Sequence, residues 1–277
     1  MDERTYSLYI VSTPIGNMDD ISVRALDALR SCDFILCEDT RQSLKLTNHF
    51  GIKKPLISYH KFNEGLTADG IIDRLLSGQR ACLISDAGTP LISDPGYTLV
   101  RKLIEHSIGF TVIPGANAVL PSSIRSGFST EHFLFYGFLD KQASKREREL
   151  KKILDSEYPV ILYASPHELR KLLEAIGRLS AGMRLCVNKE LTKLHEESFY
   201  GTASEILSLL PDSPKGEYTI VTCGKEKENR EEMSEGDMDE LFSSLTSSGM
   251  SGKEAVKVIS ERSGLPSKEL YARYMKK

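Results

Sequence analysis

The residue types best suited to chemistry in this 277-residue chain lie in four short segments, each at or just after the end of an apolar run. One of them, 85–96, reads Ser-Asp-Ala-Gly-Thr-Pro-Leu-Ile-Ser-Asp-Pro-Gly and so holds two glycines, two prolines and two aspartates. Such a loop presents backbone N–H groups and carboxylates to a ligand, while its prolines restrict the backbone. Because a simple turn needs only one glycine or proline, this segment is predicted to bind a ligand. The other three segments are 12–17, 113–118 and 187–193.

Two of these segments have a structural alternative. A tight strand-to-helix turn explains 12–17 equally well, and ordinary solvated charge at a strand end explains 187–193. The motifs of several common enzyme classes are absent from the sequence: there is no G-x-G-x-x-G after a strand, no G-x-x-x-x-G-K-[ST], no G-x-S-x-G and no H-E-x-x-H. Dinucleotide, P-loop, serine-hydrolase and zinc-protease chemistry therefore has no support.

The elements that must position these segments alternate over the first 224 residues, where short apolar runs are separated by longer amphipathic stretches. Several runs are apolar throughout, as expected for strands that are covered on both faces. This alternation predicts an α/β fold with mostly parallel strands, in which ligands bind beyond the carboxyl ends of the strands. The predicted strands are 8–12, 34–37, 56–59, 81–85, 110–113, 133–136, 160–163, 184–187 and 218–222.

Composition and local charge suggest where the chain divides. The Pro-Gly pair at 114–115 indicates a boundary, and the segment 225–240, with three basic and eight acidic residues, is predicted to be a linker. Beyond it, Ser251 and Glu254 form a capping-box pattern for a helix over 253–261, and Ser267 can cap another over 268–275. This pair resembles a helix-turn-helix, although a packing appendage is the favoured interpretation. The expected domains are 1–116 and 117–224, both α/β, then the linker 225–240 and a helical unit, 241–277.

The overall composition excludes several classes of protein. The chain is 40% hydrophobic and 27% charged with a formal charge of −3, which is typical of a globular protein and excludes a uniformly basic one. No apolar run approaches the roughly 18 residues that span a bilayer, and the N-terminus is not a secretory signal, so a cytoplasmic protein is expected. The five cysteines include no C-x-x-C pair, which predicts reduced thiols and no metal site.

Several longer motifs occur in the order typical of one family. Together they resemble the ribosomal RNA small subunit methyltransferase I family of the tetrapyrrole methylase superfamily. The resemblance covers essentially the whole chain and implies two α/β domains with S-adenosylmethionine bound in the cleft between them. It also implies methyl transfer to a cytidine 2′-hydroxyl of small-subunit ribosomal RNA, free or in the assembled subunit, by a homodimer. The motifs are 9–17, 38–41, 63–64, 85–96, 190–193, 215–217, 252–255 and 270–271.

The resemblance also implies which residues contact S-adenosylmethionine. It places Pro14 and Ile15 at the cleft edge. Gly88, Thr89 and Ile92 are placed at the methionine and ribose end of the cofactor. Tyr163, Ala164 and Tyr218 are placed around its adenine. The implied cofactor-binding residues are Pro14, Ile15, Ser85, Asp86, Gly88, Thr89, Ile92, Asn117, Ala118, Tyr163, Ala164 and Tyr218.

The implied reaction benefits from a base, because a ribose hydroxyl is a poor nucleophile. Glu38, Asp39, Asp86 and Glu190 are the candidates, and we expect Glu190 or Asp39 to assist while Arg41 holds a phosphate. Each of these charged residues could equally belong to a structural ion pair.

The RNA surface is expected on the basic segment 141–152, through Lys145, Arg146 and Arg148, together with the tail residues Arg273, Lys276 and Lys277. The alternative is a solvated helix face with charge pairs such as Glu147–Lys151.

The chain also departs from the usual family pattern. Ala164 stands where a glutamate is usual, Glu168 where an arginine is usual, and Asn188-Lys189 where Ala-Arg is common. Two other functions therefore stay open: methylation of a corrin or porphyrin precursor, as elsewhere in the superfamily, and a non-catalytic ribosome-binding relative, which the loss of a carboxylate at Ala164 motivates.

Overall fold

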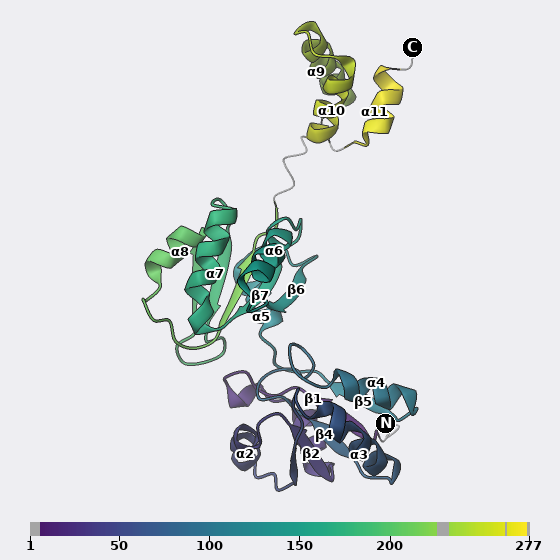
Figure 1. The fold of residues 1–277 in the computed structure, drawn as a ribbon, viewed down its shortest axis with the longest axis vertical. Helices are drawn as coiled ribbons and strands as arrows, with labels where there is room; N and C mark the ends of the chain where they lie inside the picture. Colours follow the sequence, from purple (N-terminus) through teal and green to yellow (C-terminus); the bar gives the residue numbers. More distant parts are fainter. Residues whose placement is uncertain (1–5, 226–232, 264, 276–277) are drawn as a thin grey trace. The chain divides into compact units, whose positions relative to one another are not determined.

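The computed structural model describes residues 6–225, 233–263 and 265–275. The chain forms two compact units: Met1–Leu154 with Tyr158–Cys223, and Asp155–Glu157 with Gly224–Lys277. The first unit contains two five-stranded sheets with their helices, and the second contains the last three helices (Figure 1). This is the predicted fold class, an α/β protein with a small helical C-terminal unit.

The first sheet has the strand order β3-β2-β4-β1-β5, and all of its pairings are parallel. Apolar side chains fill both faces: α3 and α4 supply Ile71, Leu75 and Leu99 to one, and α1 and α2 supply Leu29 and Leu46 to the other. Burial on both faces explains why the central strands β1, β2 and β4 are apolar throughout. The elements are β1 Leu8–Val11, η1 Met18–Asp20, α1 Val23–Ser31, β2 Phe34–Cys37, α2 Thr40–His49, β3 Leu56–Ser58, α3 Glu64–Leu76, β4 Ala81–Leu83, α4 Tyr97–Glu105 and β5 Phe110–Ile113.

The second sheet has the order β6-β7-β10-β8-β9, and of these pairings only β6–β7 is parallel. The expectation of mostly parallel strands is therefore wrong for this half. The connection between β8 and β9, residues 190–196, is too short for a parallel crossover, so the two strands form a hairpin. The elements are α5 Val119–Ser126, β6 Leu134–Phe138, α6 Ala143–Leu154, β7 Val160–Ala164, α7 Pro166–Leu179, β8 Leu185–Lys189, β9 Glu197–Gly201, α8 Ala203–Leu209 and β10 Tyr218–Thr222.

The faces of the second sheet are covered unequally. Leu150, Leu173 and Ile206, from α6, α7 and α8, pack on one face, and the single helix α5 lies against the other. The chain passes from the first sheet to α5 between Ile113 and Val119, the stretch in which the boundary at 116/117 was expected. Because one short helix covers its face, part of the sheet is left to line a cavity.

The C-terminal unit contains α9 (Glu235–Ser247), α10 (Gly252–Ser263) and α11 (Ser267–Tyr274), packed around Met238 and Ile259. Helix α9 begins inside 225–240, so the segment expected as a linker is helical from Glu235. Its N-terminus is stabilised by a capping box in which Ser234 and Asp237 exchange hydrogen bonds. Within that segment, residues 226–232 lie outside the described residues.

Two further expectations concern cysteines and membranes. All five cysteines are free thiols, and four of them are buried. Over the residues that the structure describes, none of the helices is both long and apolar enough to cross a membrane.

Candidate active site

The first unit has two halves, the first built on the β3-β2-β4-β1-β5 sheet and the second on the β6-β7-β10-β8-β9 sheet. A cavity of about 370 Å³ opens within this unit, lined by loops of the first half and strands of the second. Its size falls in the range of about 300–1,000 Å³ that small-molecule sites occupy. The loops follow β1, β4 and β5, at the carboxyl ends of the parallel strands, where ligands are expected in open α/β sheets. Of the residues that the family resemblance assigns to the cofactor, those that line the cavity are Ile15, Asp86, Gly88, Thr89, Ile92, Asn117, Ala118, Tyr163, Ala164 and Tyr218.

The two remaining residues of that set, Pro14 and Ser85, line a smaller hollow beside α2 instead. The Ser85 hydroxyl donates to the Gly88 carbonyl at 3.3 Å, so it supports the loop from behind. The backbone N–H of Gly88 donates to the Thr13 carbonyl at 3.0 Å, and the Thr13 N–H donates back to Gly88 at 2.8 Å. Gly88 therefore shapes the cavity by joining two loops, and its own N–H is already occupied.

Side-chain bonds hold the loop 85–96 against its neighbours. The Thr89 hydroxyl lies 2.9 Å from that of Ser12 and donates to the Ala116 carbonyl at 3.3 Å, which ties together the loops after β1, β4 and β5. Glu64, from the motif at 63–64, accepts from the Gly96 N–H at 3.2 Å. These bonds keep the loop rigid before any ligand arrives.

The backbone of the cavity loops is strained. In the loop 85–96, Leu91 and Ser93 have φ of 71° and 70°. In the loop between β8 and β9, Glu190 and Thr192 have φ of 52° and 66°. The left-handed region costs a non-glycine residue about 1–2 kcal/mol. Four of the five non-glycine residues with positive φ in the described part of the chain therefore belong to these two loops.

Three carboxylates from the first half gather near the cavity. Burial raises the pKa of Asp94 to about 6; the charges of Glu38 and Asp86 add to the shift, and a hydrogen bond from Ser85 opposes it. Burial also raises the pKa of Asp86 and of Glu38. Asp94 lines the cavity with Asp86, but it is missing from the residues expected from sequence. The available signal was its place as the second aspartate of 85–96.

Asp39, one of the two expected bases, has a structural role. It caps α2 by accepting from the Arg41 N–H at 2.8 Å, and it pairs with the Arg41 guanidinium through bonds of 3.1 and 2.8 Å. These bonds lower the pKa of Asp39 to about 2. Arg41 itself has a side chain that is 86% exposed despite this pair.

Glu190, the other expected base, also has partners. It accepts from the Glu217 N–H at 2.8 Å and from Lys193 Nζ at 2.9 Å. Burial alone raises the pKa of Glu190, but these hydrogen bonds outweigh burial and the pKa is lowered. Neither Asp39 nor Glu190 is among the residues that line the cavity.

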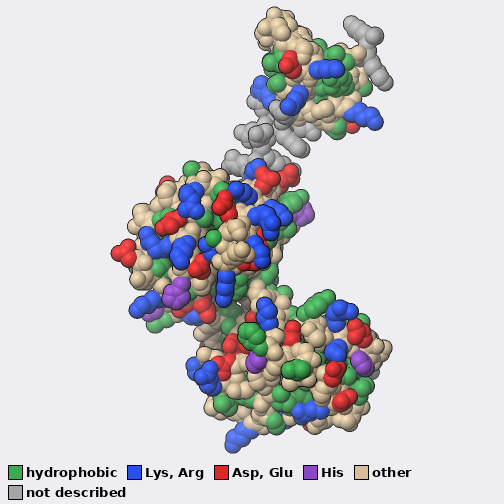
Figure 2. All heavy atoms as spheres, in the orientation of Figure 1, with side chains coloured by type: hydrophobic (Ala, Val, Ile, Leu, Met, Phe, Trp, Pro, Cys, Tyr) green, Lys and Arg blue, Asp and Glu red, His purple; other side chains and the backbone are tan. Residues whose placement is uncertain are grey.

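The expected RNA-binding side chains of α6 carry mixed charge. Arg146 pairs with Glu168 at 2.9 Å, Lys145 lies 3.8 Å from Asp140, and Arg148 is exposed. Figure 2 shows Lys and Arg side chains interspersed with Asp and Glu over the second half. The Glu147–Lys151 pair weighed against RNA binding is present at 2.9 Å. In the C-terminal unit Arg273 pairs with Asp239 and Glu235, while Lys276 and Lys277 lie outside the described residues.

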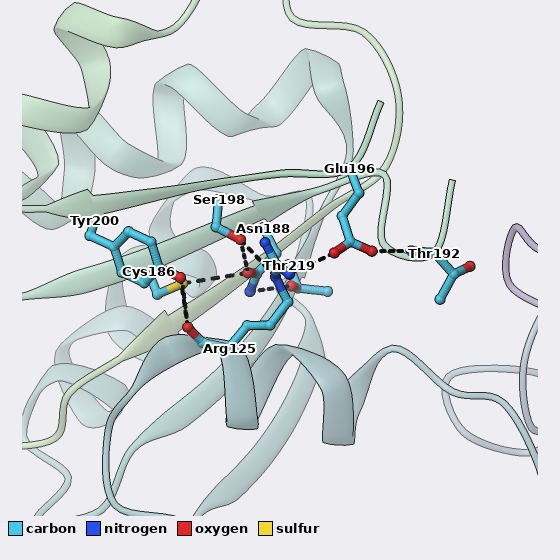
Figure 3. Close-up of polar contacts among 8 residues, drawn as sticks. All are labelled: Arg125, Cys186, Asn188, Thr192, Glu196, Ser198, Tyr200 and Thr219. Carbon is cyan, nitrogen blue, oxygen red and sulfur yellow. Dashed lines mark hydrogen bonds and ion pairs between the residues drawn. The ribbon is translucent and has the colours of Figure 1, made fainter. Parts of the chain in front are cut away.

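A chain of polar side chains runs through the second half (Figure 3). It begins at Glu196, which accepts from the Thr192 N–H at 2.5 Å and pairs with Arg125 at 2.7 Å. Arg125 Nε donates to Ser198 Oγ at 3.0 Å, and this hydroxyl lies 2.7 Å from Asn188 Oδ1.

The chain ends at the cavity, where Asn188 Nδ2 lies 3.3 Å from Thr219 Oγ1 and both side chains line the wall. At its other end it reaches the first half, because the Asn17 N–H donates to Thr192 Oγ1 at 3.2 Å. Sequence reasoning missed this chain because its members are polar residues scattered from Arg125 to Thr219, without a local motif. Among the described residues, His, Cys, Asp and Glu form no group that could hold a metal ion.

Comparison with known proteins places the chain in a family. The model of the Tetrapyrrole (Corrin/Porphyrin) Methylases matches residues 7–207. A protein of Bacillus subtilis (strain 168) named "Ribosomal RNA small subunit methyltransferase I" is 38% identical, over 96% of this chain and 93% of its own length. A protein of the same name from Mesomycoplasma conjunctivae is 48% identical, over 81% of this chain and 94% of its own.

Solved structures agree at the level of the fold. Diphthine synthase superimposes with a TM-score of 0.61 at 15% identity, over 79% of this chain and 90% of that one. Uroporphyrin-III-C-methyltransferase from Thermus thermophilus superimposes with a TM-score of 0.56 at 16% identity, over 78% and 94%. On the strength of the matches in sequence, this chain belongs to the ribosomal RNA small subunit methyltransferase I family of the tetrapyrrole methylases.

Proposed function

We propose that this protein methylates small-subunit ribosomal RNA with S-adenosylmethionine, at the 2′-hydroxyl of a cytidine ribose. The observation that carries the proposal is the cavity, which is lined by ten of the twelve residues that the family resemblance assigns to the cofactor. The names of relatives that match almost the whole chain support ribosomal RNA as the substrate.

The lining suits this cofactor. Apolar side chains such as Ile92, Tyr163 and Leu191 would cover its adenosine, and Asp86 and Asp94 supply negative charge in a lining without Lys or Arg among the described residues. When bound, S-adenosylmethionine supplies an activated methyl group on a positively charged sulfur. The protein's main contribution is to hold the acceptor hydroxyl in line with that group.

Asp94 is the proposed acceptor for the proton of the ribose hydroxyl. It lines the cavity, and a pKa of about 6 leaves it ionised at neutral pH and more basic than an ordinary aspartate. Asp39 and Glu190 are weaker candidates because Arg41 and Lys193 already hold their carboxylates and lower their pKa. In this proposal Glu190 instead positions the backbone of Gly216 and Glu217 at the cavity.

The RNA backbone is proposed to contact Arg41, Lys145, Arg146 and Arg148. Arg41 is exposed at the carboxyl edge of the first sheet, and a guanidinium can bind two phosphate oxygens at once. The homodimer implied by the family is likewise a proposal, tested by sedimentation, which would give twice the 30.9 kDa mass of the chain.

The test is to incubate the full-length protein with S-adenosylmethionine and small-subunit RNA, both free and in assembled subunits. We expect one cytidine to acquire a methyl group that blocks alkaline cleavage of the adjacent phosphodiester bond. Asp94→Asn serves as the control for contaminating activity. Methylation of a base, or no methylation of any RNA form, would refute the proposal, and methylation of a corrin or porphyrin precursor would support the alternative.

A further inference from the structure

The inner end of the Arg125 chain meets the cavity at two deeply buried side chains. Asn188 is 1% exposed and Thr219 is 5% exposed, and both residues line the cavity. Figure 3 shows their side chains within the polar chain. Buried amides and hydroxyls are normally hydrogen-bonded, because an unmade bond costs about 1–3 kcal/mol. The hydrogens of these two side chains can therefore be counted one by one.

Arg125 sets the direction of the chain. A guanidinium has donors only, so Ser198 Oγ accepts from Nε at 3.0 Å and must send its own proton elsewhere. That proton goes to Asn188 Oδ1 at 2.7 Å, and the Cys186 thiol lies within reach of the same oxygen at 3.5 Å and of the Arg125 carbonyl at 4.0 Å. The bond from Ser198 therefore identifies the oxygen of the amide and leaves its nitrogen facing Thr219.

Two donors remain after this count. Asn188 Nδ2 has two hydrogens, one of which goes to Thr219 Oγ1 at 3.3 Å. Thr219 accepts that bond, so its own O–H is free to donate. In the described part of the chain neither the second N–H of Asn188 nor the O–H of Thr219 has an acceptor. Both residues line the cavity, and we infer that a ligand bound there can accept from them.

The surroundings define the acceptor. Tyr163, Leu191 and Tyr218 make this part of the lining largely apolar, which suits a flat, uncharged group. A carboxylate or phosphate on the ligand would be bound best by a cationic side chain. The described lining contains no Lys or Arg, so an anionic group does not suit it. An unprotonated nitrogen of an aromatic heterocycle meets both conditions.

We propose that Asn188 and Thr219 form a donor pair that recognises an unprotonated ring nitrogen of the cofactor's adenine, and that Arg125 is the positioning residue that fixes their direction. This inference rests on the proposed function only for the identity of the methyl donor. It assigns specificity to side chains, in addition to the contacts that the cavity backbone can make.

The test measures binding of S-adenosylhomocysteine to the full-length protein by calorimetry, without RNA. We expect Asn188→Ala to weaken binding about tenfold and the isosteric Thr219→Val about threefold, the sizes expected for one or two hydrogen bonds. Ser122→Ala is the matched control, because it removes a buried hydroxyl that donates to the Val119 carbonyl outside the cavity, and it should leave the affinity unchanged.

Analogues of the ligand then identify the bond. In the unmodified protein, one of the 1-deaza, 3-deaza or 7-deaza analogues of S-adenosylhomocysteine should bind about tenfold more weakly. Asn188→Ala should abolish that penalty and leave those of the other analogues unchanged. Arg125→Met should shrink the same penalty, because the amide is no longer held, a change that a purely structural residue would not produce.

The outcomes separate the two proposals. Unchanged affinity in both Asn188→Ala and Thr219→Val, equal losses for all analogues, or no binding of S-adenosylhomocysteine by the unmodified protein would overturn the donor pair. If Asn188→Ala fails to fold, Thr219→Val alone decides between the outcomes. Absence of RNA methylation together with a coupled deaza penalty would refute the proposed function and leave the donor pair standing.

Discussion

The two α/β halves of the first unit bring different chemistry to one cavity, and they do so through different parts of their sheets. The first half contributes carboxylates from a loop, Asp86 and Asp94, beyond the ends of parallel strands. The second contributes two neutral side chains from within strands, Asn188 on β8 and Thr219 on β10, which pair antiparallel, and Glu217 just before β10. A parallel sheet exposes its strand ends together, whereas a sheet only partly covered by helices leaves strand side chains open to a ligand.

The two halves also differ in how the pKa of their carboxylates near the cavity is shifted. In the first half, Asp86 and Asp94 are partly buried with other carboxylates nearby, and their pKa is raised. In the second half, Glu190 is neutralised by Lys193 and a backbone N–H, and its pKa is lowered. We infer that proton transfer belongs to the first half and side-chain recognition of the adenine to the second.

Replacement of Asp94 is the strongest test of this division. Asp94→Asn keeps the shape but cannot accept a proton, and we expect a loss of at least about 100-fold in methyl transfer, the size typical of general-base removal. Binding of S-adenosylhomocysteine should change by less than about threefold, since recognition is assigned to the other half. Exposed Asp212→Asn is the control, and a variant at Asp94 with full activity would remove it from the mechanism.

The pH dependence tests the same assignment without a mutation. Asp94 is ionised above its pKa of about 6, so the rate should fall roughly tenfold for each pH unit below that value. The folded state binds this proton more tightly than the unfolded chain does, so ionised Asp94 destabilises the fold as pH rises from about 4 to 6. A rate profile that is flat between pH 5 and 8 would argue against this base.

Gly16 lies where the two halves touch, so a substitution there should affect the parts of the cavity that both halves supply. A Cβ at Gly16 would lie 2.4 Å from Lys193 Cγ and 2.7 Å from Thr192 Oγ1, so Gly16→Ala must push the loops apart. We expect a loss of about 1–3 kcal/mol in unfolding free energy, measured in denaturant, with weaker ligand binding. Gly70→Ala in α3, where a Cβ meets nothing within 4 Å, should be neutral or stabilising. Equal stability of the two variants would mean that this contact is not tight.

The smallest expected effect concerns RNA affinity. Replacing exposed Arg148 by alanine should reduce the salt dependence of RNA binding by about 0.7–0.9 in log–log slope, as for one lost phosphate contact. Lys152→Ala also removes one positive charge, at the other end of the same helix, and is the matched comparison. If both slopes equal that of the unmodified protein, the RNA lies elsewhere.

The sequence was sufficient for features that depend on local pattern. The all-apolar central strands of the first sheet and the glycine- and proline-rich loop 85–96 could be placed from the sequence, because each is marked by a run of consecutive residues. Strand β9 was missed because Glu197, Ser198 and Tyr200 are polar or exposed on an edge, so no apolar run marks it. The antiparallel pairing and the Arg125 chain could not be predicted, since they depend on residues that only the folded sheet brings together.

The candidate bases show the same limit more sharply. Asp39, Glu190 and Asp94 are chemically equivalent carboxylates in the sequence, and only tertiary partners distinguish them. Arg41 pairs with Asp39 and Lys193 pairs with Glu190, and both pairs lower the pKa of the carboxylate. Asp94 is instead buried near other carboxylates, which raises its pKa. A prediction from residue type alone therefore selected two carboxylates that already had partners.

The left-handed backbone at Leu91, Ser93, Glu190 and Thr192 has a consequence for how this protein can evolve. Glycine would adopt these conformations without the steric cost. Two of these side chains nevertheless make contacts that glycine would remove: Leu91 packs against the core of the first half, and Glu190 binds Lys193 and the Glu217 N–H. Losing a partly buried leucine side chain costs more than the backbone strain that glycine would relieve. A laboratory selection that rewards only heat resistance should therefore leave Leu91 and Glu190 unchanged, and the strained backbone persists because the side chains it carries are needed.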